Sequence, residues 1–307
     1  MKPREHRRRT TPSDPDSAVF PCSISNPWNK IAFMPVEAVQ HVRRMRGGAQ
    51  AQLMRASDGH FYVVKFQNNP QHLRVLANEL LATRIAERIG LPVPVTEVIA
   101  VGEWLISNTP ELRIETGLRP VPCAPGLQLG ARYVCDPAEA QVFDYLPETM
   151  MDKLKNRAAF AGMLVLDKWL GNANGRQAVF YKKAREHKYS ASFIDQGYCF
   201  NAGEWDFPDS PLRGVYARNK VYEDVRGWES FEPWLSRIEK FNPAWVREIA
   251  GEIPPQWIEH DWEPLKKLTE QIIDRRSKVR DLITAFRNSS RQPFPAWTEA
   301  AQKAMVQ

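Results

Sequence analysis

The segment NRAAFAGMLVLDKWL, residues 156–170, constrains the fold most, because as a helix it carries apolar residues on every side. Such a helix has no face for water, so other elements must surround it. The chain has 307 residues, of which 43% are hydrophobic, and this is enough to bury a sizeable core. We therefore expect one large domain, or two intimately joined domains, with this helix inside.

A loop crowded with polar residues follows this segment directly, in the stretch LGNANGRQAVF, residues 170–180. Asn172, Asn174, Arg176 and Gln177 are of types that can bind phosphate or a substrate. The alternative is that they are ordinary solvated residues of a surface loop. The choice depends on what the rest of the chain places beside the loop.

The first half of the chain predicts a sheet with one helix packed on it. Residues 31–67 contain strand-like runs broken by two turn signals, Gly47-Gly48 and Asp58-Gly59, and favour an antiparallel sheet. Apolar residues then recur at helical spacing until Gly90 and Pro92 end the pattern; they are Leu73, Leu76, Leu80, Ile85 and Ile89. Further strands are expected over 93–108, a surface loop over 109–130, and a short connecting strand at GARYV, residues 130–134.

The second half is expected to be mainly helical. After the loop, YSASFIDQGYCF, residues 189–200, indicates a strand pair or a strand with a turn. Helices separated by prolines are predicted beyond it, at 231–241, 243–253 and 261–289.

Three charged residues stand in apolar surroundings. Lys65 lies in the predicted strand HFYVVKFQ and Glu79 in the predicted helix LANELLA, where each charge would be costly to bury alone. Kinases use a strand lysine paired with a helix glutamate to hold nucleotide phosphates. Asp195 follows an apolar strand, as a metal-binding aspartate would. Taken singly, an exposed lysine and a solvated glutamate are the favoured interpretations of Lys65 and Glu79, and an aspartate in a turn before Gly197 is a common one of Asp195.

Composition excludes several classes of protein. No apolar run approaches the length of a membrane span, and the basic start of the chain has no apolar segment behind it, so we expect neither an anchor nor a secretory signal. The net charge is +6, but basic residues are concentrated at the start of the chain, where a disordered basic arm is the usual interpretation, so we do not infer a nucleic-acid partner. Four scattered cysteines, at 22, 123, 135 and 199, favour reduced thiols and a cytoplasmic protein.

Taken in order, the motifs resemble the HipA-like kinase domain family, in its compact branch without the toxin's extra N-terminal region. The motifs are GGAQAQL, YVVKFQNNPQ, NELLATRIAERIGLPVP, LDKWLGNANGRQAVF and FIDQG, and the resemblance covers about residues 35–285. It implies an α+β fold of two lobes, like that of protein kinases, with ATP and Mg²⁺ between them. The expected parts are a flexible basic leader (1–27), an N-lobe with an antiparallel sheet and one main helix (28–130), a helical C-lobe (131–290) and a tail (291–307).

The resemblance also implies roles for single residues. Lys65 would contact the nucleotide phosphates, Glu79 would orient Lys65, and Asp195 would hold magnesium. Gly47, Gly48 and Gln50 of the glycine loop would line the nucleotide, as glycines let the backbone approach a phosphate. The loop residues Asn172, Asn174 and Arg176 would stand at the catalytic centre.

The loop departs from the family at two positions. The family usually has an aspartate where this chain has Asn174, and a metal-binding asparagine at the place of Val179. Phosphoryl transfer needs an acceptor for the hydroxyl proton and metal to neutralise phosphate charge. Asp167, on the preceding helix, is a candidate replacement base, although a structural role in fixing the loop is favoured.

Two hypotheses follow. The first is an ATP-binding kinase homologue whose phosphotransfer to a protein or small-molecule hydroxyl is impaired by Asn174 and Val179. The second is a pseudokinase, a binding or scaffolding module that is catalytically dead. Fold alone does not decide between them.

Overall fold

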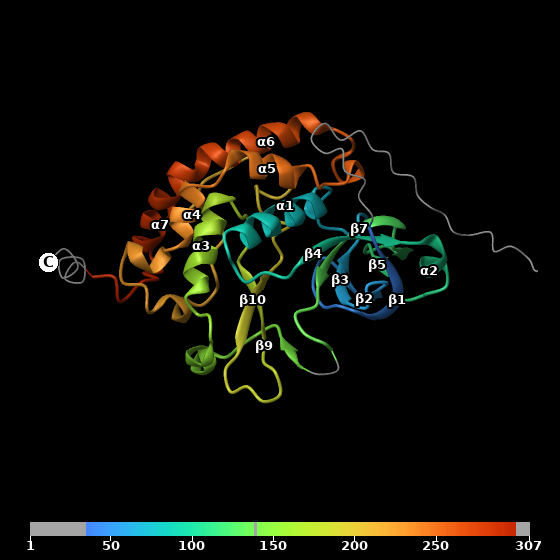
Figure 1. Ribbon diagram of the computed structural model, residues 1–307, viewed down its shortest axis with the longest axis horizontal. Helices are drawn as coiled ribbons and strands as arrows, with labels where there is room; N and C mark the ends of the chain where they lie inside the picture. The colour runs from blue at the N-terminus through green and yellow to red at the C-terminus, as the bar shows by residue number, and fades with distance from the viewer. Residues whose placement is uncertain (1–34, 138–139, 299–307) are drawn as a thin grey trace, which may run out of the picture.

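The computed structural model describes residues 35–137 and 140–298, so the predicted leader and the end of the tail lie outside the described residues. Strands gather at one end of the molecule and helices at the other (Figure 1). Helix α1 (Val75–Arg88) lies between the two ends and contacts β4, β7 and α5. The chain is therefore a mixed α+β protein, as the sequence predicts.

A closed barrel forms the strand-rich end. Its strands follow one another in space as β1 (Val36–Arg44), β2 (Gln52–Ala56), β3 (Phe61–Lys65), β7 (Gly126–Arg132) and β4 (Thr96–Val101). Neighbours are antiparallel except for β1 and β4, which close the barrel as a parallel pair. The antiparallel sheet expected over 31–67 is present as β1 to β3, but it is only part of this barrel.

The region 109–130 differs from the predicted surface loop. It contains the short hairpin β5 (Arg113–Glu115) and β6 (Pro120–Pro122), and then most of β7, which lies between β3 and β4. Several of its Pro and Gly residues lie within these strands, at Pro120 and Pro122 of β6 and at Gly126 and Gly130 of β7. Within 93–108, β4 is the expected strand, while α2 (Glu103–Ser107) is a short helix where another strand was expected.

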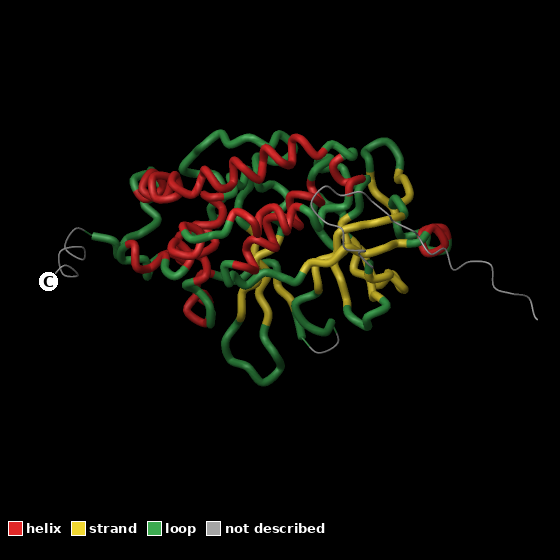
Figure 2. Tube along the Cα trace, turned by 45° about the horizontal axis from the view of Figure 1, so that its top comes forward, coloured by secondary structure: helices red, strands yellow, loops and turns green. Residues whose placement is uncertain are grey.

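Helices and a small sheet make up the other end (Figure 2). The α-helices are α3 (Ala159–Trp169), α4 (Trp234–Glu239), α5 (Pro243–Ala250), α6 (Trp262–Asp274) and α7 (Val279–Arg287). Short 3₁₀ turns occur at Glu148–Lys153, Asn219–Tyr222, Trp228–Phe231, Pro255–Ile258 and Arg275–Lys278. The last turn divides the predicted 261–289 helix in two. Strands β8 (Val142–Phe143), β9 (Gln177–Tyr181) and β10 (Ser190–Ile194) form an antiparallel sheet beside them.

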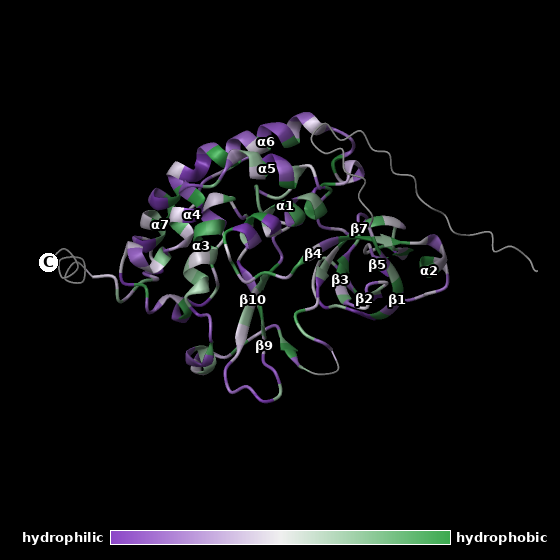
Figure 3. Ribbon diagram, in the orientation of Figure 1, coloured by the Kyte–Doolittle hydropathy of each residue, from purple (hydrophilic) through white to green (hydrophobic). Residues whose placement is uncertain are grey.

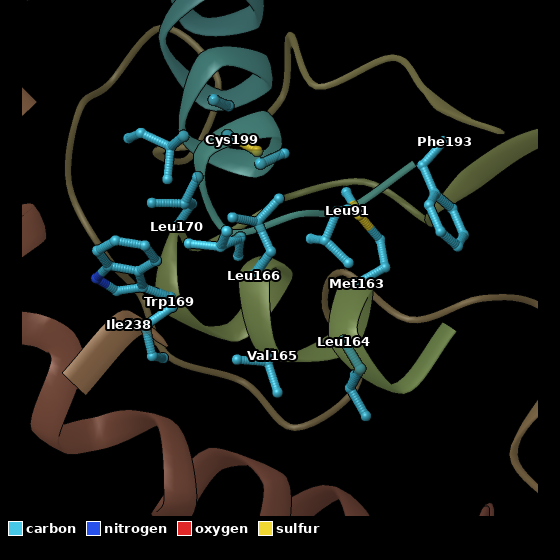
Figure 4. Close-up of a cluster of buried hydrophobic side chains, with 14 of the residues drawn as sticks. Leu91, Met163, Leu164, Val165, Leu166, Trp169, Leu170, Phe193, Cys199 and Ile238 are labelled. Atoms are coloured by element: carbon cyan, nitrogen blue, oxygen red, sulfur yellow. The ribbon is translucent and has the colours of Figure 1, made fainter. Parts of the chain in front are cut away.

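Helix α3 is the centre of the main hydrophobic core. Every residue from Ala159 to Trp169 is buried, which confirms the prediction made from its all-round apolar pattern. Figure 4 shows Met163, Leu166 and Trp169 packed among side chains of neighbouring elements. The outer helices α6 and α7 instead contain many hydrophilic residues (Figure 3) and bury one face. In the described part of the chain, no helix combines the length and the hydropathy needed to cross a membrane.

The barrel closes tightly around Gly130, in the middle of β7. This residue pairs with Val64 of β3 and Glu97 of β4. A Cβ placed on Gly130 would lie 2.5 Å from Cγ1 of Ile99, whose side chain is fully buried. Only glycine therefore lets β7 approach its neighbours at this point.

We predict that Gly130→Ala destabilises the protein by about 1–3 kcal/mol, because the added methyl overpacks a closed core. The sign of the change in the free energy of unfolding is informative, because alanine in a strand is otherwise more favourable than glycine by about 0.5–1 kcal/mol. Urea denaturation measures the effect. The matched control is Gly102→Ala, where an added Cβ has no atom within 4 Å, and its stability should stay within about 1 kcal/mol. Equal stability of the two variants would contradict this account of the barrel.

Candidate functional site

A cavity of about 600 Å³ lies where the barrel meets the small sheet and α1. Part of its wall is apolar and includes Val63, Leu129, Val134, Val179 and Ile194. Another part is charged or polar and includes Gly47, Gly48, Lys65, Gln71, Glu79 and Asp195. A ligand with an apolar portion and an anionic portion would match such a wall.

Lys65 holds the charged part of the cavity together. It is the last residue of β3, and its ammonium contacts Glu79 Oε2 of α1 and, at 2.7 Å, Asp195 Oδ1 after β10. Lys65 is 9% exposed and Glu79 is 4% exposed. The interpretations of Lys65 and Glu79 as exposed or solvated residues are therefore wrong. The ammonium of Lys65 also joins β3, α1 and the segment after β10, which are distant in sequence.

The electrostatics of this cluster follow from its burial. Burial alone would lower the pKa of Lys65, but the carboxylates of Glu79 and Asp195 outweigh it and raise that pKa, so the ammonium stays charged. Burial raises the pKa of Glu79 despite its contact with Lys65. Burial opposes ionisation of Asp195 too, but Lys65, Arg176 and Gln177 together lower its pKa. Asp195 is thus an ionised carboxylate beside the cavity.

The glycine turn between β1 and β2 forms one wall of the cavity. Gly47, whose φ of 117° favours glycine, and Gly48 both line it. Gln50 is not among the lining residues. Its side chain instead bonds the main chain of Glu115 at 2.7 and 2.8 Å and accepts from Arg44, so it fixes the turn from outside.

Two of the predicted catalytic residues, Arg176 and Asn172, are buried within the loop and do not line the cavity. Arg176 is 4% exposed, and its guanidinium donates to both carboxylate oxygens of Asp167 and, at 2.8 Å, to the carbonyl of Ile194. Asn172 is 1% exposed; it donates to Asp167 Oδ1 and accepts from the Asn174 main chain. These hydrogen bonds hold the loop in its shape, and Asp167 accepts most of them. Asp167 therefore has the structural role that the sequence favours.

The exposed part of the loop presents amides to the cavity. Asn174 and Gln177 both line it. Gln177 begins β9, pairs with Ile194 of β10, and donates from Nε2 to Asp195 Oδ2 at 2.7 Å. Val179 lies two residues further along β9, pairs with Ser192 and belongs to the apolar part of the wall. The side-chain amide that bonds Asp195 is therefore that of Gln177.

The cavity wall has few side chains that could bind a divalent metal, but these are of a suitable type. The described residues contain no cluster of three or more His, Cys, Asp or Glu side chains able to hold a metal. Mg²⁺ is, however, commonly held by one or two protein oxygens together with substrate phosphates and water. Asp195 Oδ2 and the side-chain amide of Gln177 fit that kind of site once the amide turns, because in this structure its Nε2, and not its oxygen, faces Asp195.

Two further lining residues were missed by sequence reasoning. Asp144 follows β8 and is an exposed carboxylate in the cavity wall. Gln71 lies between β3 and α1, inside the quoted motif YVVKFQNNPQ. Neither stands out in the sequence, because an acidic residue after a short strand and a glutamine in a polar loop are common.

Comparison with known proteins places the fold among kinases. The proinflammatory kinase CtkA of Helicobacter pylori superimposes with a TM-score of 0.53 at 14% identity, covering 84% of this chain and 100% of CtkA. A hydra Fam20 structure with sugar gives 0.49 at 9% identity, with 84% and 88% covered, and a Golgi casein kinase gives 0.48 at 13%, with 82% and 74% covered. The first of these shows a protein-kinase-like fold.

A search of curated protein sequences found no match. The profile described as HipA-like kinase matches residues 38–288, which include the cavity, every helix of the described residues and the barrel except the first two residues of β1. The chain therefore belongs to the HipA-like kinase family.

Proposed function

We propose that this protein binds ATP with Mg²⁺ between two lobes, the barrel end and the helical end, and transfers phosphate slowly to a protein or small-molecule hydroxyl. The observation that carries the proposal is the Lys65–Glu79–Asp195 cluster, which faces a cavity also lined by a glycine turn. The apolar wall suits a nucleotide base and the charged wall suits phosphates. A cytoplasmic location belongs to the same proposal, supported by Cys123, Cys135 and Cys199, which are free thiols.

Each residue of the cluster has a distinct task in this proposal. Lys65 donates to phosphate oxygens, Glu79 holds Lys65 in place from α1, and Asp195 with Gln177 provides oxygen atoms for the metal. Magnesium, when bound, supplies positive charge that neutralises the phosphates. Gln177 thereby takes the part that the family resemblance assigns to residue 179, and Val179 contacts the base instead.

The missing part is a base. Asn174 carries no negative charge, and its Oδ1 accepts from the Gly175 main chain at 2.8 Å. An amide cannot accept the hydroxyl proton, so catalysis would rest on positioning and charge alone. This observation also favours the alternative function, a pseudokinase that binds nucleotide and a partner without phosphotransfer.

We predict that Lys65→Ala weakens ATP–Mg²⁺ binding by roughly 10-fold or more, the usual loss for a hydrogen bond to a charged group. Isothermal titration calorimetry measures the dissociation constant. The melting temperature of the free variant should also fall, since removing one partner of a buried ion pair costs about 3–5 kcal/mol.

The control separates binding from stability. Adding Glu79→Gln to Lys65→Ala removes one uncompensated carboxylate, so it should restore part of the stability without restoring affinity. If wild type shows neither binding heat nor a melting shift with millimolar ATP and Mg²⁺, the proposed nucleotide site is refuted.

We predict that Asn174→Asp raises ATP turnover or autophosphorylation by about 100-fold, the lower range of general-base contributions. Asn174→Ala should leave the slow wild-type rate unchanged, and Val179→Asn should give no gain because residue 179 lies in the apolar wall. Radiolabelled phosphate transfer measures all three. Fast wild-type transfer that Asn174→Ala leaves intact would place the base elsewhere, and Asp144→Asn then tests the remaining exposed carboxylate of the wall.

We predict that Gln177→Ala weakens Mn²⁺ binding to the nucleotide complex by about 10-fold, comparable with losses at groups that hold or orient metal ligands. The paramagnetic resonance signal of free Mn²⁺, titrated with protein and ADP, measures this without catalysis. Asp195→Asn is the positive control and should abolish the bound fraction. Unchanged Mn²⁺ affinity in Gln177→Ala would exclude Gln177 from the metal site.

A further inference from the structure

Asn78 precedes Glu79 in α1 and holds the segment that follows Asp195. Its side chain is fully buried. Its amide nitrogen donates to three carbonyl oxygens, those of Gly197 at 3.0 Å, Cys199 at 3.0 Å and Ala202 at 2.6 Å. An amide nitrogen carries two hydrogens, so the whole donor capacity of this side chain is used by one segment.

The contact with Trp205 settles which way this amide points. The indole nitrogen of Trp205 can only donate, and it lies 2.6 Å from Asn78 Oδ1. The oxygen of the amide therefore faces Trp205, and its nitrogen faces the three carbonyls. Asn78 does not line the cavity, so its effect on a ligand would pass through the segment that it holds.

That segment has an unfavourable backbone. Phe200, Asn201 and Ala202 have φ angles of 60°, 55° and 58°, in the left-handed region that residues other than glycine rarely adopt. Such conformations persist only where the surroundings determine them. The main-chain N–H of Phe200 is held by the carbonyl of Leu170 at 2.7 Å, and Asn78 provides the contacts from α1. Without Asn78, we expect the segment to relax away from this helix.

Gly197 brings the same segment into close contact with α1. A Cβ on Gly197 would lie 2.5 Å from Cγ2 of Val75 and 3.5 Å from Oε2 of Glu79. The main chain two residues after Asp195 therefore lies against the helix that carries the glutamate partner of Lys65. Movement of this segment away from α1 would shift Asp195 relative to Lys65 and Glu79.

We propose that Asn78 is a positioning residue for the metal: by holding the segment after Asp195 on α1, it keeps the Asp195 carboxylate where Mg²⁺ would bind with the nucleotide. This inference rests on the proposed nucleotide site. A bound phosphate would take part of the Lys65 ammonium from Asp195, whereas the contacts of Asn78 lie outside the cavity and stay intact. Asn78 thus sets the affinity for metal and has little effect on the affinity for metal-free nucleotide.

The test measures these two affinities separately. The paramagnetic resonance signal of free Mn²⁺, titrated with protein and ADP, gives the metal affinity, and calorimetry with ADP and EDTA gives the affinity for metal-free nucleotide. Asn78→Ala should weaken Mn²⁺ binding by about 10-fold, as for other groups that orient metal ligands. It should change the affinity for metal-free ADP by less than about twofold, because Asn78 does not line the cavity.

Trp205→Phe is the matched control for a loss of stability. It removes the indole donor from the same network and leaves the three bonds from Asn78 to the segment. Its melting temperature should therefore fall, while its Mn²⁺ affinity should stay within about twofold of wild type.

Gly197→Ala is the second variant, and it decides the question if Asn78→Ala does not fold. The added methyl would displace the same segment from Val75 without altering Asn78. Mn²⁺ binding should again weaken while binding of metal-free ADP is retained.

The outcomes separate this inference from the proposed function. If wild type binds neither ADP nor Mn²⁺ with ADP, the nucleotide site itself fails. If wild type binds both, the positioning role is refuted when Asn78→Ala leaves Mn²⁺ affinity unchanged or weakens both affinities by the same factor. It is also refuted when Trp205→Phe weakens Mn²⁺ binding as much as Asn78→Ala does. In these last cases the nucleotide site stands.

Discussion

The buried ammonium of Lys65 is the interaction on which the rest of the site depends. It joins a barrel strand, helix α1 and the segment after β10 through two carboxylates. Breaking such a buried ion pair is strongly unfavourable, because the remaining charges have no compensation. The side chain of Lys65 therefore fixes the positions of these three elements relative to one another. A bound phosphate would share this ammonium with the carboxylates, so nucleotide binding would be coupled to the same three elements.

A second buried ion pair supports the loop in the same way. Arg176 and Asp167 have side chains that are 2% and 0% exposed. Arg176 also reaches the carbonyl of Ile194, the residue before Asp195. The loop and Asp195 are thus held by one network, although Arg176 itself does not line the cavity. Residues that a motif marks as catalytic act here by positioning their neighbours.

The sequence predicted the elements better than their pairing. The all-round apolar pattern of α3 indicated its burial, and Lys65, Glu79 and Asp195 stood out because charges in apolar segments need partners. The strand expected at residues 130–134 met only the end of β7, since the prolines and glycines of 109–130 hid the alternation of Leu127, Leu129 and Ala131. The inward direction of Arg176 and the contact of Gln177 with Asp195 depend on long-range strand register, which local spacing does not contain.

The acidic residues that the fold needs are different from the acidic residue that catalysis would need at position 174. Glu79 and Asp195 are engaged with Lys65, and Asp167 is enclosed with Arg176, so each is stabilised by a cation that the fold needs. Asn174 is exposed, and its exchange for aspartate would disturb no buried contact. A chain can therefore lack a carboxylate at residue 174 at little cost in stability and retain the buried Lys65–Glu79–Asp195 cluster. The same reasoning explains why a kinase homologue and a pseudokinase can share this structure and differ at one exposed residue.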